Sequence, residues 1–221
     1  MSDALAAMLP IAAGIAISPI PITGVILMLL SDRAIHNALA VLAGWMAAIA
    51  AIVAVVTLVG GGAGADEEPA TGFVVAQFVL AAILLAAATR RWRMRPKPGE
   101  PHVVPKWMGG LRAITPPRAL ALGLGLIFLN PKDALLSVAG GAELAEAEPS
   151  AAEGLVSLAA FVVVASLTIA APIVATLAIG PRSAPILQRS REWLERHGNA
   201  AVAVVLFVLG VLVAFDAARG L

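Results

Sequence analysis

The chain has 221 residues, of which 60% are hydrophobic and only 13% are charged, and its formal net charge is +1. A soluble domain is about 45–50% apolar and about 25% charged, so this composition excludes an ordinary water-soluble fold and predicts an all-α integral membrane protein. The chain has no cysteine and three scattered histidines. We therefore expect no disulfide, no thiol chemistry, no metal site and no cofactor.

Six apolar segments are long enough to cross a membrane as helices, since a span needs about 20 apolar residues. They run over residues 4–30, 35–59, 71–89, 118–142, 154–179 and 199–216. The first segment could be mistaken for a secretory signal, but it carries Asp3, has no Lys or Arg before its apolar run, and continues to Leu30. We interpret it as a retained membrane helix.

The polar connections between these segments alternate in charge. With Arg118 at the edge of the fourth segment included, thirteen of the 15 basic residues lie in the first, third and fifth connections, whereas the second and fourth carry acids and no base. Basic loops stay in the cytoplasm. The pattern therefore predicts a multi-pass membrane protein with both termini on the extracytoplasmic side. The Ala-rich composition, with far more Arg than Lys, indicates a bacterial plasma membrane.

Residues 90–117 form the longest connection and contain six prolines among many basic residues. This composition is typical of an extended segment rather than a folded domain. We interpret it as a cytoplasmic loop that sets the topology and contacts lipid. Docking of a partner is the alternative, and nucleic-acid binding is not expected. Residues 1–221 are thus predicted to form a single transmembrane domain, with three-helix halves at 1–89 and 118–221.

Proline interrupts two of the predicted spans. GIAISPIPITG in the first contains Ser18, Pro19 and Pro21, and GLIFLNPKDALL in the fourth contains Asn130 and Pro131. Ser and Asn are favoured N-caps, and Pro is favoured at the first helical position but removes a donor from a continuing helix. Both spans should break near mid-membrane and restart, the fourth at Pro131 and the first at either Pro19 or Pro21.

The two breaks lie three spans apart, which inverts the second half of the chain relative to the first. This spacing predicts six transmembrane helices in a 3+3 inverted repeat, a common plan of transporters. The restarted helices would expose free N–H groups and positive dipole ends, which bind carboxylate, phosphate or sulfate. The alternative is that proline only kinks the helices for packing, as we expect for Pro172.

A charged pair, Lys132 and Asp133, directly follows the second break. Ionisable residues at membrane depth are costly, which makes them candidates for function. We expect Lys132 either to meet an anionic head group or to extend to the membrane interface, and Asp133 either to form a capping box with Asn130 or to carry a proton. Adjacent helical residues point about 100° apart, so the two need not pair with each other.

The candidate substrate-binding site has no catalytic residue and consists of Ser18, Pro19, Pro21, Asn130, Pro131, Lys132 and Asp133. Other small or weakly polar residues within the spans are expected to serve helix packing. Interhelical hydrogen bonds are predicted for Thr57, Gln77, Ser166, Thr168 and Thr176, and close helix approach is predicted at Gly123 and Gly125.

The order of the motifs resembles a known family. SPIP at 18–21, SDRAIHNALAVLAGW at 31–45 and PKWMGGLRAITPPRALALGLGLIFLNPKDALL at 105–136 are similar to the GAP family, the glycolipid- or sulfolipid-addressing membrane proteins of actinobacteria, within the LysE exporter superfamily. The resemblance implies six helices in two inverted halves and outward movement of a lipid, glycolipid or small solute. It points to the same site residues, except that the family block often reads NPKN where this chain has Asp133.

The favoured function is a plasma-membrane transporter that exports a lipid or glycolipid with an anionic head group, for which Lys132 is the counter-charge. One alternative is a LysE-type exporter of amino acids or other small solutes. The other is a non-transporting accessory subunit that docks a lipid-synthesis enzyme, or another cell-envelope partner, through residues 90–117. The sequence has no Walker A motif, and its spans hold no catalytic triad or paired carboxylates, so we expect no enzyme activity. The oligomeric state stays open.

Overall fold

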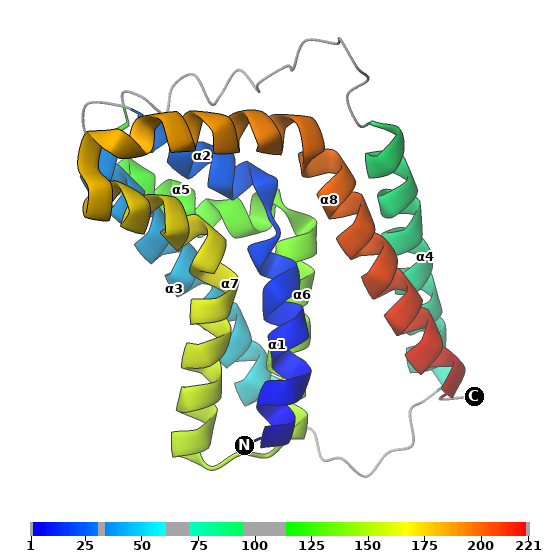
Figure 1. Cartoon of the computed structure of the whole chain (residues 1–221). Coiled ribbons are helices and arrows are strands. Elements are labelled where there is room, and N and C mark those ends of the chain that lie inside the picture. Colours follow the sequence, from blue (N-terminus) through cyan, green and yellow to red (C-terminus); the bar gives the residue numbers. More distant parts are fainter. Residues whose placement is uncertain (1, 31–33, 61–70, 95–113, 220–221) are drawn as a thin grey trace. The chain divides into compact units, whose positions relative to one another are not determined.

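The computed structural model describes residues 2–30, 34–60, 71–94 and 114–219, which are largely helical and contain no strand. The helices are α1 (Ser2–Ala16), α2 (Pro19–Leu29), α3 (Ala34–Gly60), α4 (Thr71–Arg93), α5 (Pro116–Leu129), α6 (Pro131–Glu146), α7 (Ala151–Ile179) and α8 (Ala184–Arg219), with the 3-10 helix η2 (Gly180–Ser183) between α7 and α8 (Figure 1). The predicted all-α class is confirmed for this part of the chain.

The chain divides into two compact units. The first consists of Met1–Ala63 and Val103–Glu192, and the second of Gly64–His102 and Trp193–Leu221. The first unit therefore holds α1, α2, α3, α5, α6, α7, η2 and the beginning of α8, whereas the second holds α4 and the rest of α8. All the candidate site residues belong to the first unit.

Several helices are long and apolar enough to cross a membrane. α3 qualifies, as does the apolar stretch Ala151–Phe215, which contains α7 and most of α8. Two bent pairs each qualify when their helices are taken together, Leu5–Ala16 with Pro19–Leu29 and Pro116–Leu129 with Pro131–Glu146. The described helices thus supply two spans, or up to four, and the chain is a membrane protein. The six-helix count and the inverted repeat stay predictions.

Both bent pairs break where the prolines predict. The chain turns by 55° between α1 and α2 and by 83° between α5 and α6. Ser18 and Asn130, the residues before Pro19 and Pro131, have nearly the same extended backbone, with φ −125° and ψ 94° at Ser18 and φ −120° and ψ 92° at Asn130. Proline forces its predecessor out of the helical region, which explains both conformations. The first restart is at Pro19, not at Pro21.

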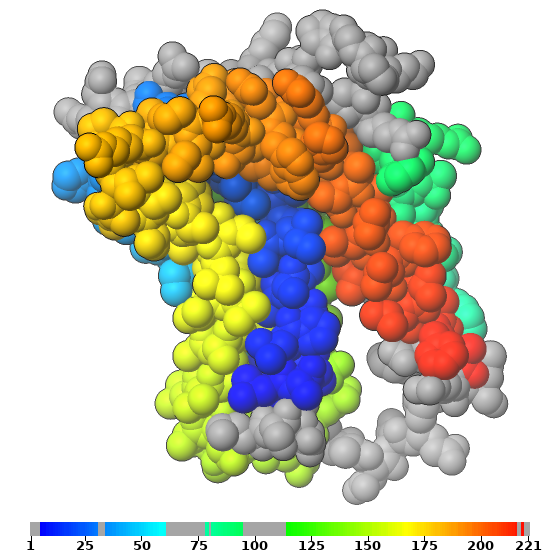
Figure 2. Space-filling view, viewed as in Figure 1, coloured from blue at the N-terminus to red at the C-terminus, as the bar shows by residue number. Residues whose placement is uncertain are grey.

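Packing in the first unit crosses between the two predicted halves. α3 contacts both segments of the second broken helix, α5 and α6, and α7 contacts both segments of the first, α1 and α2. α1 also packs against α6. Each broken helix is therefore braced by a helix from the other half of the sequence. The space-filling view shows the side chains of α1 and α7 in continuous contact on the visible face (Figure 2).

The closest approach of α3 and α5 depends on two glycines. A Cβ added at Gly44 would collide with the backbone oxygen of Leu120, and one added at Gly123 would collide with that of Val41. Small residues allow such close packing between membrane helices. The prediction for Gly123 is confirmed, whereas that for Gly125 is wrong, because nothing lies within 4 Å of a Cβ added there.

The second unit is a pair of packed helices. Side chains of α4 meet side chains of α8 in a small apolar cluster of Leu84, Ala88, Val202 and Leu206. At the end of α4, the Asn199 amide donates to the Met94 carbonyl at 3.1 Å and accepts from Arg91 at 3.3 Å. These bonds satisfy a backbone carbonyl at the C-terminal end of α4 and fix that end to α8.

Large apolar side chains also face outward from the helices. Leu58 is 79% exposed on α3, and Leu155 is 68% exposed on α7. An apolar solvent stabilises such side chains, whereas water does not. Their exposure is the arrangement expected of helices surrounded by lipid.

Candidate functional site

The two helix breaks meet at a polar cluster made of Ser18, Asn130, Lys132 and Asp133. The Ser18 hydroxyl lies 2.7 Å from each carboxylate oxygen of Asp133. The Asn130 amide donates to Asp133 Oδ2 at 2.7 Å, and Lys132 Nζ lies 2.7 Å from Asp133 Oδ1. Three side chains thus donate to one carboxylate, and they join residues that lie 115 positions apart in the chain.

The cluster is buried in the first unit. Asp133 and Ser18 are 0% exposed, Lys132 is 4% exposed and Asn130 is 8% exposed. The alternative in which Lys132 extends to the membrane interface is therefore wrong. Lys132 and Asp133 also form an ion pair, although neighbouring helical residues need not pair, because the long lysine side chain reaches back to the carboxylate.

The break in the first helix leaves carbonyl groups that other elements satisfy. The Ser18 amide bonds to Ala16 O instead of to Gly14 O, its partner in a continuous helix. Lys132 Nζ donates to the Gly14 carbonyl, and the Thr168 hydroxyl of α7 donates to the Ala16 carbonyl. Cationic donors are favoured at a helix C-terminus, where the dipole is negative.

The N-caps differ from the prediction in one respect. Asn130 and Ser18 occupy the N-cap positions, with Pro131 and Pro19 directly after them. Neither side chain makes a capping hydrogen bond, so the predicted capping box between Asn130 and Asp133 is wrong. Both side chains bond to the Asp133 carboxylate instead, because a buried charge needs donors more than the helix start does.

The three site prolines act through the backbone. Pro19 and Pro131 fix the restarts of α2 and α6, and Pro21 is buried in the first turn of α2. A proline has no N–H, so none of them donates a backbone hydrogen bond to the cluster. Pro19 and Pro131 contribute the bends that place Ser18 and Asn130 beside Asp133.

The packing predictions are only partly confirmed. Thr57 donates to Gly141 O on α6 at 3.1 Å, and Thr168 bonds to α1, so both link helices as predicted. Within the described part of the chain, Thr176 donates to its own helix, at Pro172 O, and the Ser166 hydroxyl is buried without a partner. The side chain of Gln77 lies outside the described residues.

Sequence reasoning missed several parts of the site. The link between Ser18 and Asp133, the contact of Lys132 with Gly14, and the hydrogen bond from Ser137 to the Asp133 carbonyl at 2.8 Å all depend on tertiary placement or rotamers. The only sequence signal for them was the presence of polar residues beside both breaks. Among the described residues, no group of three or more His, Asp or Glu side chains is arranged to hold a metal.

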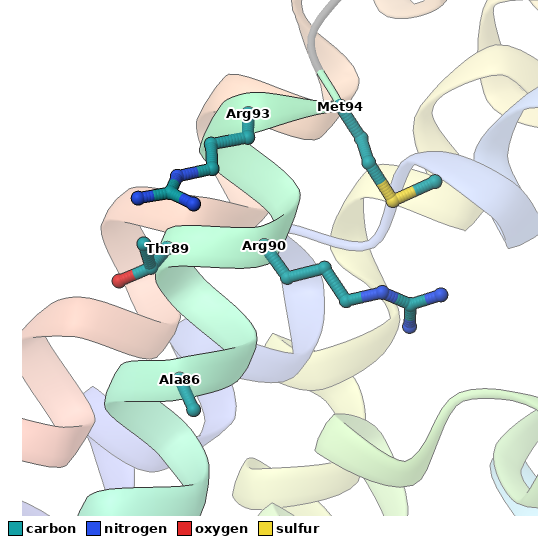
Figure 3. A pocket seen from close by; sticks show the side chains of 5 residues that line it. All are labelled: Ala86, Thr89, Arg90, Arg93 and Met94. Atoms are coloured by element: carbon teal, nitrogen blue, oxygen red, sulfur yellow. The ribbon is translucent and has the colours of Figure 1, made fainter.

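A separate open cavity of about 470 Å³ lies along the end of α4 in the second unit (Figure 3). Ala86, Thr89, Arg90, Arg93 and Met94 line it. None of the predicted site residues lines this cavity. Basic residues in the last turn of a helix complement its dipole, which accounts for the two arginines without a ligand.

Comparison with known proteins assigns the family. The model of a family described as SfLAP, "Sap, sulfolipid-1-addressing protein", matches residues 8–218. No curated protein and no solved structure matches the chain. The match spans both broken helices and nearly the whole chain, so this membrane protein belongs to the sulfolipid-1-addressing protein family.

Proposed function

We propose that this protein moves a lipid or glycolipid with an anionic head group from the inner to the outer side of a bacterial plasma membrane. The observation that carries the proposal is the buried Lys132–Asp133 pair at the junction of the two broken helices. The family description, which concerns the addressing of a sulfolipid, supports a lipid as the cargo.

The position of the pair supports a transport role over a purely structural one. Charged residues inside membrane helices are costly and typically mark substrate or ion pathways. Transporters with inverted repeats place their sites where discontinuous helices meet near the membrane centre. The similar extended backbones at Ser18 and Asn130, and the bracing of each broken helix by the other half, agree with that plan.

The site also has the chemistry to bind an oxyanion. Lys132 supplies a positive charge, and Ser18 and Asn130 supply neutral donors directed at the same place. Sulfate, phosphate and carboxylate groups each accept several such hydrogen bonds. A head group of this kind would take the donors that Asp133 holds in this structure.

The accessory role is the second candidate, since addressing a lipid can also mean recruiting the enzyme that makes it. In that case residues 90–117, most of which lie outside the described residues, would dock the enzyme, and the Lys132–Asp133 pair would only stabilise the helices. The LysE-type export of small solutes is a third reading and predicts a change in the secreted small molecules instead of the surface lipids.

A complementation experiment separates these functions. A deletion strain of the native host would receive the wild-type gene, a Lys132→Met gene, or a gene whose loop lysines Lys97 and Lys106 are changed to Gln. Surface lipids and secreted solutes would be profiled at equal membrane levels of the three proteins. We expect the strain with Lys132→Met to lose one anionic lipid class from its surface, whereas the strain with the loop variant keeps that class. The reverse result would support the accessory role and overturn the transport site.

A further inference from the structure

We infer that Asp133 is a resident anion of the site, and that an anionic head group binds only when Asp133 takes up a proton. This inference rests on the proposed function, because it concerns the same site and the same class of substrate. It adds a stoichiometry: one proton enters the site with each singly charged head group.

The geometry places Asp133 in the position that a head group would occupy. Ser18 Oγ, Asn130 Nδ2 and Lys132 Nζ all lie 2.7 Å from its carboxylate oxygens. These are the polar and charged side chains that both helix breaks contribute to the cluster. A sulfate or phosphate oxygen would use the same donors, so the head group and the ionised carboxylate compete for them.

The buried site must stay electrically neutral when the head group binds, and this requires a proton on Asp133. Without a head group the cluster is neutral, because the positive charge of Lys132 balances the negative charge of Asp133. Addition of a singly negative head group to an ionised Asp133 would leave a net negative charge in a site from which water is excluded, with Asp133 itself 0% exposed. Burial of an uncompensated charge is strongly unfavourable. Protonation of Asp133 restores neutrality and releases Lys132 to the head group.

The protonated carboxyl can also be accommodated. Its new O–H is a donor, and the Ser18 hydroxyl, which now donates to the carboxylate, can turn and accept from it. The Asn130 amide has two N–H groups, so one can keep its bond to the remaining carbonyl oxygen of the carboxyl while the other serves the head group. The Asp133 carboxyl thus stays hydrogen-bonded in both protonation states.

Other titratable groups on the surrounding helices are not the group that takes up the proton. On the elements packed against the cluster, the described side chains of this kind are His36 on α3, Arg118 on α5, Glu143 and Glu146 on α6, and Glu153 on α7. In the described part of the chain, the polar side chains that contact the Asp133 carboxylate are instead Ser18, Asn130 and Lys132. Of the paired groups, Lys132 must keep its charge to attract the anion, so the proton goes to Asp133.

Protonation of Asp133 also determines which gradient can drive transport. The loaded site, with Lys132 charged, Asp133 protonated and one negative head group, carries no net charge. Its movement across the membrane would therefore be insensitive to the membrane potential, whereas it would respond to the pH on each side. A pH difference, rather than the potential, would bias the direction of transport.

Proton uptake on binding tests the inference directly. The purified protein in phosphatidylcholine nanodiscs would be titrated with dihexanoylphosphatidylglycerol, and with dihexanoylphosphatidylcholine as the uncharged control, in weak buffer with a pH dye. We expect about one proton taken up per anionic lipid bound, and an affinity that falls about tenfold per pH unit where Asp133 is ionised. Asp133→Asn should bind the anionic lipid without proton uptake and without that pH dependence.

The outcomes separate this inference from the proposed function. Binding of the anionic lipid by the wild type without proton uptake would overturn the inference and leave the anion site intact. Equal binding by Lys132→Met, or no binding of either lipid by the wild type, would overturn both. Proton uptake by the wild type on lipid binding tests the inference without any variant. The double variant Lys132→Met/Asp133→Asn, which lacks both charges, should fold but bind no anion, and it controls for misfolding.

Discussion

The hydroxyl of Ser18 lies 2.7 Å from both carboxylate oxygens of Asp133, although 115 positions separate the two residues in the chain. This contact joins the break in the first broken helix to the restart of the second. It exists because Pro19 and Pro131 turn the backbone at the residues that precede them. The polar cluster is therefore a product of both breaks together, and either break alone would leave the charged pair with fewer donors.

Replacement of Ser18 tests this contact. Ser18→Ala removes one donor from a buried carboxylate, and hydrogen bonds to charged groups contribute about 1.5–3 kcal/mol. We expect a loss of that size in the free energy of unfolding, measured in mixed micelles. Ser157→Ala is the matched control, because the Ser157 hydroxyl is buried without a partner in the described part of the chain. Equal losses in the two variants would show that the contact with Asp133 does not stabilise the fold.

Removal of one member of the ion pair should cost more than removal of both. Asp133→Asn leaves Lys132 buried without its counter-charge, and breaking a buried pair costs about 3–5 kcal/mol. Replacement of both charges, in Lys132→Met/Asp133→Asn, should restore most of that stability. Thermal unfolding of the three proteins in one detergent measures the difference. A double variant as unstable as the single one would mean that the charges are not coupled.

The crossing of α3 and α5 should tolerate no side chain at its glycines. Gly44→Ala or Gly123→Ala places a methyl group against a backbone carbonyl of the other helix. Overpacking of this kind typically costs about 1–3 kcal/mol. Gly125→Ala is the control on the same helix, where a Cβ meets nothing within 4 Å, and it should stabilise the helix by up to about 1 kcal/mol. Opposite signs for Gly123→Ala and Gly125→Ala are the expected result of the unfolding measurement.

The orientation in the membrane is a separate prediction from the loop charges. Basic connections should lie in the cytoplasm, so both termini should be extracytoplasmic. Alkaline phosphatase fused after Leu221 should be active in cells, since it folds only outside the cytoplasm, and a fluorescent protein at the same point should be dark. A fusion within residues 95–113 should give the reverse pattern. An active phosphatase in that loop would invert the predicted topology.

The breaks could be predicted from the sequence because their cause is local. Proline removes a donor and restricts its predecessor, whatever the rest of the chain does. Asn130 was therefore correctly placed at a helix restart, and the first restart was narrowed to Pro19 or Pro21. The charged pair could also be recognised from the local sequence alone, because a lysine beside an aspartate in an apolar run is unusual and costly within a membrane.

The contacts of the site could not be predicted because they depend on tertiary packing. The sequence favoured capping roles for Ser18 and Asn130, but the buried carboxylate takes both side chains. Gly123 and Gly125 look equivalent in the sequence, yet only Gly123 faces α3, because residues two apart in a helix lie on different faces. Which face is buried is decided by the partner helix.

Lipid transfer by the purified protein is the decisive test of the proposed transport function. Wild type and Lys132→Met would be reconstituted into separate vesicles of lipid from the native host, containing the lipid class that the deletion strain fails to expose. Transfer of that lipid between leaflets would be followed by its accessibility to a membrane-impermeant reagent. We predict faster transfer with the wild type than in protein-free vesicles, and no acceleration with Lys132→Met. Wild-type vesicles that match protein-free ones, or an unaffected Lys132→Met, would contradict the proposed function.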